Sequence, residues 1–538
     1  MLFKIKPMRN NPTLILVISL LLLSNTILAQ LNTINWQKTY GGTKLESSAV
    51  IVPKTNNQGY FIVSHSSSDI GYEKTENSFG GSDIWILSID SIGNILWDKT
   101  FGGSANESAA DALIINDKLY VLSGSTSPIS GNKTAVNYGS SDFWLFCLDF
   151  NGQINWQASF GGLNSESAQE LTYYNGNLFV FGTSNSPTSG NKTEDSYGDF
   201  DYWMVKVDTL DGQIVDQKTI GSTTTDILND AEMDDFGNIF VLGSSPMGVS
   251  GLKSSIGYGD VDYWIVKLDN NLQLLNQQCF GGTGNENAYS GDLLFVNNNF
   301  IITGTSDANQ SGSINEAGNG LYDAWVFCID ANLNLQWNRL FGGSNSDSGA
   351  RAIPFLDSSI LILSSSSSNV SGNKTAVSYG LSDCWLIAID YQGNEIYQST
   401  IGGSNNDFAK DAISTSNNNL VVLTNSTSGI SGLKDDFSRG MDDVWIFELN
   451  TSALVGIDEN LANSKNNIEL FPNPASETLT ISLPENASTT DCILVDNLGK
   501  EVKRFMVTGG ENLVDVSALE NGIYFIQMDT EIYKLIKN

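Results

Sequence analysis

The sequence lacks the groups on which common hydrolases depend. It has a single histidine, His65, and no G-x-S-x-G motif, so neither a zinc hydrolase nor a usual serine triad is expected. His65 lies in the stretch FIVSHSSS, whose serine-rich flanks recur elsewhere without histidine, and we interpret it as an ordinary strand residue. No catalytic residue is predicted.

Basic residues are also scarce. The chain has 27 Lys and Arg against 60 Asp and Glu, which gives a net charge of −33. Such a charge repels nucleic acid and anionic membranes, so neither is an expected partner. The acidic residues are spread along the chain, so they favour solubility without indicating a ligand.

The spacing of the cysteines does not indicate disulfide pairs. There are five, an odd number, which argues against a disulfide framework. Cys147 and Cys328 each follow an equivalent tryptophan by three residues, so both are expected to be small buried side chains.

Long hydrophobic runs are absent beyond the first 30 residues. The one such run, 14–23, follows Lys4, Lys6 and Arg9 and precedes Ile27-Leu28-Ala29. A basic start, a short apolar core and a small residue at the cut predict a secretory signal peptide over 1–29. The alternative, a retained membrane anchor, is disfavoured because the run is short for a span. The mature chain is therefore expected to have no transmembrane segment.

What the sequence does have is a repeat. Seven tryptophans follow one another at steps of 59, 59, 61, 61, 60 and 60 residues, and each has Asp two positions earlier and Gly three positions before that Asp. A fixed period of this kind indicates an array of identical units. The paired residues are Asp83 and Trp85, Asp142 and Trp144, Asp201 and Trp203, Asp262 and Trp264, Asp323 and Trp325, Asp383 and Trp385, and Asp443 and Trp445.

Each unit is expected to form four antiparallel strands. In the second unit these are ESAADALIIND, KLYVLSGSTS, SDFWLFCLD and INWQASF, with Asn151-Gly152 as a hairpin turn before the last. Seven such units over 31–450 predict an all-β, seven-bladed β-propeller. A stacked solenoid is the alternative, but repeats of about 60 residues are long for one.

The ends of the repeat predict how the ring closes. The fourth-strand phrase already occurs before the first unit, as INWQKTYGG, and the seventh unit lacks its own copy. We expect the N-terminal segment to complete the seventh blade, which would leave no sheet edge exposed. An open solenoid would have no use for this offset.

The Asp-x-Trp pairs are interpreted as mainly structural. Residues two apart in a strand point to the same face, so the tryptophans are expected to fill the space between blades while each Asp accepts backbone N–H bonds from its loop. The repeated phrases FGGSxxES, GNKT and GxxDxW resemble a bacterial seven-bladed propeller repeat family found in secreted proteins. That resemblance implies a fold more than an activity.

The composition changes after residue 450. Residues 451–467 have the polar composition of a linker, and 468–538 show alternating apolar residues that predict a small antiparallel β-sandwich. This segment resembles the C-terminal sorting domain of type IX secretion cargo in the Bacteroidetes, an ordinary adhesive sandwich being the alternative. The residues that carry the resemblance include Pro472, Asn473, Pro474, Gly499, Gly522, Tyr524 and Lys534.

The resemblance implies a route and a partner. The signal peptide would bring the chain to the periplasm, and the type IX machinery would then recognise the tail and move the chain across the outer membrane. The protein is therefore expected to be secreted or held at the cell surface. The sequence leaves open whether the tail is cleaved and which of these two fates applies.

An acidic residue recurs four positions after the second residue of each glycine pair or its equivalent. If these acids approach the mouth of the channel, clustered carboxylates there could bind a hard cation such as Ca²⁺. The alternative, which we favour, is that each acid accepts hydrogen bonds from its own glycine-rich turn. No other cofactor is predicted. The seven acids are Glu46, Glu107, Glu166, Asp226, Glu286, Asp347 and Asp407.

The face that carries the long second-to-third-strand loops is the best candidate for a binding surface, because its loops are long, polar and set on a rigid scaffold. We therefore expect a non-enzymatic binding or surface-interaction protein with an extracellular glycan or protein ligand. A polysaccharide hydrolase or lyase is the alternative, since paired carboxylates can cleave glycosides. The near-equivalence of the blades argues against that alternative.

The tail assignment is tested by truncation and transfer. A chain that ends near Thr451 should fold normally but remain in the periplasm of its host, because few contacts are expected to cross the linker. Fusing 451–538 behind an unrelated protein with a signal peptide should carry that protein across the outer membrane. Immunoblots of periplasm and medium measure both. Secretion of the truncated chain at the wild-type level would contradict the assignment.

Overall fold

The structure is a computed structural model that describes residues 33–307, 309–356, 359–451, 469–471, 475–483, 489–496, 500–519, 522–528 and 531–537. The predicted signal peptide, the linker beyond Thr451, Pro472 to Pro474 and Gly499 lie outside the described residues. The described part consists of strands and one 3-10 helix, η1 (Thr55–Asn57). No helix within it is long and apolar enough to cross a membrane.

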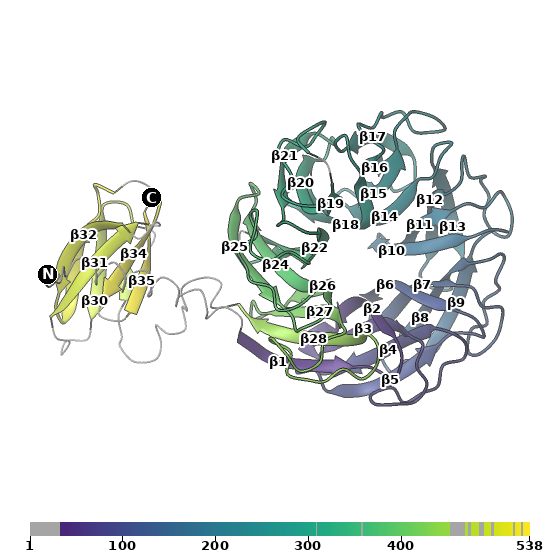
Figure 1. Cartoon of the computed structure of the whole chain (residues 1–538), viewed down its shortest axis with the longest axis horizontal. Helices are drawn as coiled ribbons and strands as arrows, with labels where there is room; N and C mark the ends of the chain where they lie inside the picture. Colours follow the sequence, from purple (N-terminus) through teal and green to yellow (C-terminus); the bar gives the residue numbers. More distant parts are fainter. Residues whose placement is uncertain are drawn as a thin grey trace, which may run out of the picture. The chain divides into compact units, whose positions relative to one another are not determined.

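Seven four-stranded antiparallel sheets surround a common axis and form the blades of a propeller (Figure 1). The predicted seven-bladed fold is confirmed. In blades 1 to 6 four consecutive strands make one sheet, with the first strand nearest the axis. Blade 1 contains β2 (Glu46–Pro53), β3 (Tyr60–Ser66), β4 (Asp83–Ile89) and β5 (Ile95–Phe101), and blade 2 contains β6 (Glu107–Ile115), β7 (Lys118–Ser125), β8 (Asp142–Asp149) and β9 (Ile154–Phe160).

The next four blades repeat this order. Blade 3 contains β10 (Glu166–Tyr174), β11 (Asn177–Ser184), β12 (Asp201–Asp208) and β13 (Ile214–Ile220), and blade 4 contains β14 (Ile227–Met233), β15 (Ile239–Pro246), β16 (Val261–Leu268) and β17 (Leu274–Phe280). Blade 5 contains β18 (Glu286–Val296), β19 (Asn299–Ser306), β20 (Asp323–Asp330) and β21 (Leu335–Phe341), and blade 6 contains β22 (Asp347–Phe355), β23 (Ser359–Ser366), β24 (Asp383–Asp390) and β25 (Glu395–Ile401).

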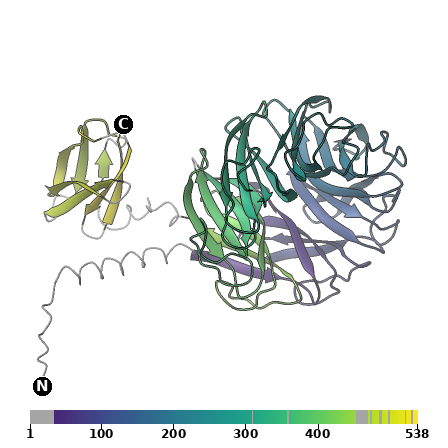
Figure 2. The same cartoon turned by 45° about the horizontal axis from the view of Figure 1, so that its top comes forward.

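The seventh blade is closed by the N-terminal strand, as the sequence predicts. Its sheet runs β1-β28-β27-β26, from β1 (Thr33–Tyr40), β28 (Asp443–Asn450), β27 (Leu420–Ser426) and β26 (Asp407–Ser414). β1 and β28 lie side by side in both views of the ring (Figures 1 and 2). The side chain of Gln37 on β1 accepts a hydrogen bond from the indole of Trp445 at 3.0 Å and donates one to the Leu433 carbonyl at 3.0 Å.

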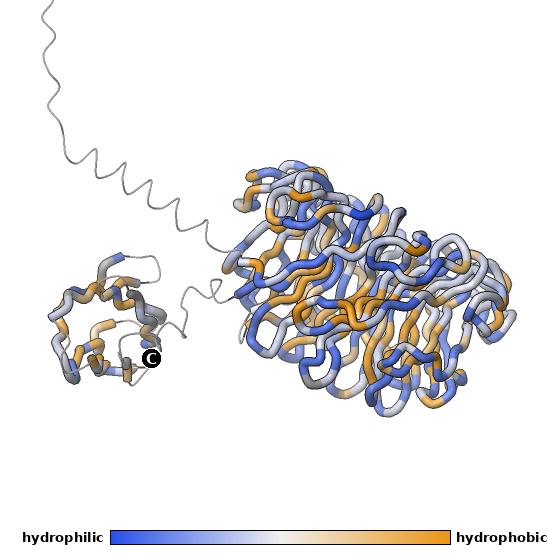
Figure 3. The backbone as a smooth tube through the Cα atoms, turned by 90° about the horizontal axis from the view of Figure 1, so that it is seen from below, coloured by the Kyte–Doolittle hydropathy of each residue, from blue (hydrophilic) through white to orange (hydrophobic). Residues whose placement is uncertain are grey.

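The core lies within and between the blades. All seven repeat tryptophans are fully buried, and hydrophobic segments alternate with polar turns along the chain (Figure 3). Trp203 of blade 3 packs on Phe143 of blade 2 with ring centroids 5.0 Å apart, and Trp264 of blade 4 packs on Tyr202 of blade 3 at the same distance. The tryptophans therefore contribute to the packing of each blade on its neighbour. Buried aromatic side chains dominate the energetics of such packing because each removes a large apolar area from water.

The strands after the propeller form a separate compact unit. One sheet contains β29 (Glu469–Phe471), β30 (Thr478–Leu483) and β33 (Gly510–Asp515), and the other contains β32 (Glu501–Val507), β31 (Thr490–Asp496), β34 (Gly522–Met528) and β35 (Glu531–Lys537). A core that includes Leu479, Ile481, Leu494, Ile526 and Leu535 is buried in this unit. The predicted small antiparallel sandwich is confirmed.

Removal of the closing strand tests the ring. Deleting 31–42 should lower the melting temperature of the secreted chain markedly, because β28 loses its neighbour, Trp445 loses its partner Gln37, and a sheet edge opens. Differential scanning calorimetry measures the change, with deletion of the sorting tail as the control for chain shortening. An unchanged propeller transition would show that β1 contributes nothing to closure.

Candidate functional site

The seven recurring acids are buried at the blade junctions. Each is at most 2% exposed. In blade 2, Glu107 accepts a 2.9 Å hydrogen bond from the Gly103 N–H and a 2.7 Å bond from the Ser125 hydroxyl. Gly103 lies in the loop that leaves blade 1, so the carboxylate ties two blades together. The same backbone bond, four residues back, is made by Glu46, Glu166, Asp226, Glu286, Asp347 and Asp407.

The Asp of each Asp-x-Trp pair lies beside one of these acids. Oδ2 of Asp142 accepts a 2.5 Å hydrogen bond from the Tyr138 N–H, and the matching loop bond occurs at Asp83, Asp201, Asp262, Asp323, Asp383 and Asp443. A Cβ added at Gly161 would stand 2.1 Å from Asp142 Oδ1 and 2.7 Å from Glu166 Oε2. The two carboxyl groups thus converge over the first glycine of the pair, which explains the repeated glycine.

Burial raises the pKa of the aspartate in six of these carboxyl pairs. Burial, together with the charge of nearby Glu166, raises the pKa of Asp142 to about 7, and burial also raises the pKa of Asp201 to about 7. Among the described residues, no group of three or more His, Cys, Asp or Glu side chains is arranged to hold a metal ion. The structure therefore places each acid in its own turn and does not gather the seven acids around one ion.

The lysines of the GNKT phrase are buried. Lys133 is 1% exposed, and its ammonium donates to the carbonyls of Ser127 and Ala135 at 3.0 and 2.9 Å and lies 6.0 Å from the Trp144 ring centroid. The loops that the sequence suggested as a binding surface therefore point their lysines inward. The other buried lysines of this kind are Lys74, Lys192, Lys253, Lys374 and Lys434.

A second set of charges lies at the axis, and sequence reasoning missed it. Every innermost strand has an irregular register with its neighbour at the same place, as a β-bulge produces. The residues that follow these irregularities, which we call the axial ring, are Val50, Asp111, Glu170, Asp230, Asp292, Arg351 and Asp411. Six of the seven units carry a charged residue at this position, which could have indicated the axial ring from sequence. These residues do not stand out because the chain contains many other acids.

The axial ring contains one cation among five acids. Arg351 of blade 6 forms a 2.9 Å ion pair with Asp411 of blade 7 and a 3.9 Å contact with Asp292 of blade 5. Its charge also acts on Glu170 and Asp230 of blades 3 and 4, which only a position near the axis allows.

The acids of the axial ring link neighbouring blades, and burial raises their pKa values. Oδ2 of Asp411 accepts from the Ile51 N–H of blade 1 at 2.9 Å, and Oδ2 of Asp111 accepts from the Leu171 N–H of blade 3 at 3.0 Å. Burial raises the pKa of Asp111 to about 6. Burial and the charges of two neighbouring aspartates raise the pKa of Glu170 well above its usual range.

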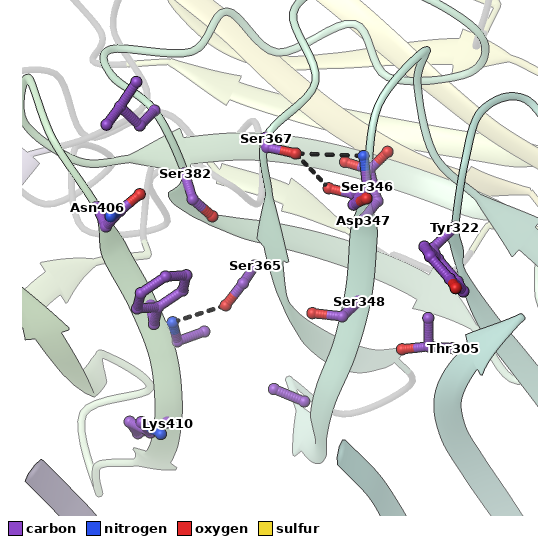
Figure 4. Close-up of a pocket in the computed structure, with 14 residues that line it drawn as sticks. Thr305, Tyr322, Ser346, Asp347, Ser348, Ser365, Ser367, Ser382, Asn406 and Lys410 are labelled. Carbon is purple, nitrogen blue, oxygen red and sulfur yellow. Dashed lines mark hydrogen bonds between the residues drawn. The ribbon is translucent and has the colours of Figure 1, made fainter. Parts of the chain in front are cut away.

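A cavity of about 690 Å³ lies among blades 5, 6 and 7, beside the innermost strands of blades 6 and 7. Figure 4 shows Tyr322 on one wall, Asn406 and Lys410 on the opposite wall, and Ser348 and Ser365 between them. The Ser365 hydroxyl accepts a 3.0 Å bond from the Ala409 N–H, which links blade 6 to blade 7. The other residues that line the cavity include Asp347, Ser346, Ser367, Ser382, Leu381 and Phe408.

Two positions that vary among the seven units line this cavity. Phe408 occupies the position after the recurring acid that Ser47, Ser108, Ser167 and Ser348 hold in other blades. Tyr322 and Phe408 are each 39% exposed. Lys410 stands where alanine occurs in blades 1, 2 and 6. The expectation that the blades are nearly equivalent therefore holds for their scaffold and not for these side chains. Aligning the seven units would have shown from sequence that Phe408 and Lys410 differ from their equivalents in other blades.

The other residues singled out in the sequence lie on strands or in the buried cores. His65 lies on β3, and burial together with the charge of Lys410 lowers its pKa. All five cysteines are free and buried. In the tail, Gly522 begins β34, Tyr524 is buried in the sandwich core, and Lys534 lies on β35.

The axial ring yields a pH-dependent prediction. Arg351→Gln should lower the melting temperature more at pH 8 than at pH 5. Acids whose pKa is raised in the folded state bind more protons folded than unfolded, so they cost stability as pH rises through the folded pKa. Loss of the guanidinium raises these pKa values further and increases that cost.

Thermal melts at both pH values measure the effect. Arg339→Gln is the matched control, because Arg339 pairs with Glu316 at 3.4 Å on a partly exposed surface where ion pairs contribute little. An equal loss at pH 5 and pH 8 for Arg351→Gln would show that its charge does not compensate the axial acids.

Comparison with known proteins gives distant likenesses. The chain is 27% identical over 187 residues to Regulatory protein FlaEY of Caulobacter vibrioides, which covers 32% of this chain and 19% of that protein. The chain thus spans about a fifth of that relative. Two solved structures are similar at TM-scores of 0.42 and 0.44: the Neurospora crassa Pan2 WD40 domain (9% identical, 77% of this chain, 94% of that chain) and the plexin A4 extracellular region (8%, 92% and 62%).

The tail gives a direct family match. Residues 469–538 match the family described as secretion system C-terminal sorting domain. This match covers both sheets of the C-terminal sandwich. The chain therefore ends in a type IX sorting domain, which interacts with the secretion machinery and directs the protein to the cell surface or the medium.

Proposed function

We propose that the protein is an exported binding protein that holds its ligand in the cavity of blades 5, 6 and 7. The observation that carries this proposal is that unrepeated side chains meet in one cavity. A scaffold residue is repeated from blade to blade, whereas Phe408 and Lys410 depart from the repeat and line the same cavity. Ligand sites commonly combine exposed aromatic side chains with a few polar groups in one concave place.

The same cavity favours binding over hydrolysis. Glycoside cleavage by the usual route needs two carboxyl groups that are free to act. Asp347 is the carboxylate among the lining residues, and it is already held: its Oδ2 accepts from the Gly343 N–H at 2.7 Å and the Ser368 hydroxyl at 2.8 Å, and its Oδ1 accepts from Ser366. This arrangement supports an extracellular glycan or protein segment as a bound ligand rather than a substrate.

Restoring the repeat residues tests the proposal. Phe408→Ser and Tyr322→Ser place in the cavity wall serine, which several other blades carry at these positions, so folding should be retained. Each should weaken ligand binding about ten-fold or more, as truncation of a central aromatic contact does. The full chain is screened on a glycan array and in pull-downs of extracellular proteins, and melting curves verify folding.

Phe236→Ser is the matched control, because Phe236 is 81% exposed in the turn between β14 and β15. It should bind as the wild type does. Ligands that bind the wild type and both cavity variants equally would place the binding site elsewhere on the protein.

A further inference from the structure

The cavity contains a cation without an assigned partner. Lys410 lies on β26, is half-buried and lines the cavity. Its ammonium forms no hydrogen bond and no ion pair within 4 Å with any residue in the described part of the chain. Lysine presents three donors that are costly to leave unused when water is partly excluded. A ligand that supplies acceptors would therefore gain from this group.

The acids near Lys410 do not form ion pairs with it, so its ammonium is available to a ligand. Asp442 is the acid whose charge acts on it, and His65 is the neighbouring group whose pKa it lowers. Neither forms an ion pair with it. Asp347, the carboxylate of the cavity lining, already accepts three hydrogen bonds within its own blade junction.

The rest of the lining suits a polyhydroxylated ligand. The side chains of five lining residues make no hydrogen bond to another described residue, and they add hydroxyl and amide groups that can both donate and accept. The rings of Tyr322 and Phe408 are partly exposed at this site. A sugar ring presents hydroxyls at its rim and apolar C–H faces, which matches this mixture. The five residues are Tyr322, Ser346, Ser348, Ser382 and Asn406.

The charge of the whole protein limits the density of acid groups on the ligand. A net charge of −33 repels a polymer that carries a carboxylate on every unit. An oligosaccharide in which acidic and neutral sugars alternate carries half that density of charge, which reduces this repulsion, and it still supplies one carboxylate to one lysine.

We propose that the cavity recognises an acidic oligosaccharide, with a sugar carboxylate bound to Lys410 and neutral sugar hydroxyls bound to the serine, tyrosine and asparagine side chains opposite and beside it. This inference rests on the proposed function and specifies its ligand. Lys410 selects the acid group, and Phe408 and Tyr322 contact the sugar ring.

A matched pair of ligands tests the inference. The probe is a hyaluronan oligosaccharide, in which glucuronate alternates with a neutral sugar, and its counterpart is the same oligosaccharide with every carboxylate reduced to an alcohol. Isothermal titration calorimetry with the full chain should give about ten-fold weaker binding for the reduced form, because one charge-assisted hydrogen bond is lost.

Variants of Lys410 assign the effect to this residue. Lys410→Ala introduces the residue found at Ala49, Ala110 and Ala350, so it should fold, bind the acidic form about ten-fold more weakly and no longer distinguish the two forms. Lys410→Arg should keep the preference. Lys118→Ala is the control, since Lys118 lies at the start of β7 in blade 2, outside the cavity.

The outcomes separate the inference from the proposed function. If both forms bind equally and Phe408→Ser weakens both, the cavity binds sugars without reading the acid, and the inference is overturned while the proposed function stands. If a protein segment binds in the cavity and neither oligosaccharide does, the inference is likewise overturned. If Lys410→Ala keeps the full preference for the acidic form, another cation reads the carboxylate and the assignment to Lys410 is wrong.

Discussion

A buried carboxylate at each blade junction is the contact on which the ring depends. Glu107 accepts bonds from the loop that leaves one blade and from the second strand of the next, and its equivalents repeat the backbone bond at every junction. The first glycine of each pair is required because carboxyl oxygens occupy the space that a Cβ would take. Because this junction is built from short local contacts, it can be copied seven times, and the faces around it are free to vary.

Much of the fold was predictable because it follows from repeated local patterns. The Gly-x-x-Asp-x-Trp spacing gave the blade count, and the early INWQ phrase predicted closure by β1. The acids at the junctions were found by spacing, but their burial was not, because a carboxylate near a glycine-rich turn looks the same whether it faces solvent or a neighbouring acid. Arg351 and the axial acids depended on strand irregularities that bring distant blades together, which one unit of sequence does not reveal.

The candidate site was predictable only as a departure from the repeat. Tyr322, Phe408 and Lys410 are unremarkable residues taken one at a time. They gain meaning because the scaffold brings Tyr322 of blade 5 close to the innermost strands of blades 6 and 7, so that side chains far apart in the chain line one cavity. The repeated residues at the junctions therefore fix the geometry of the blades, and a few unrepeated side chains determine the chemistry of the cavity.

The closing strand also orders events in time. The hydrogen bond from Trp445 to Gln37 spans 408 residues, so the segment that completes the ring is made early and waits for almost the whole propeller to follow. Contacts of such sequence separation form late in folding, since the intervening chain must first be ordered. β28 ends at Asn450, immediately before the unit that carries the export signal. The ring thus cannot close before β28 has formed, and a chain interrupted in any blade keeps β1 unpaired.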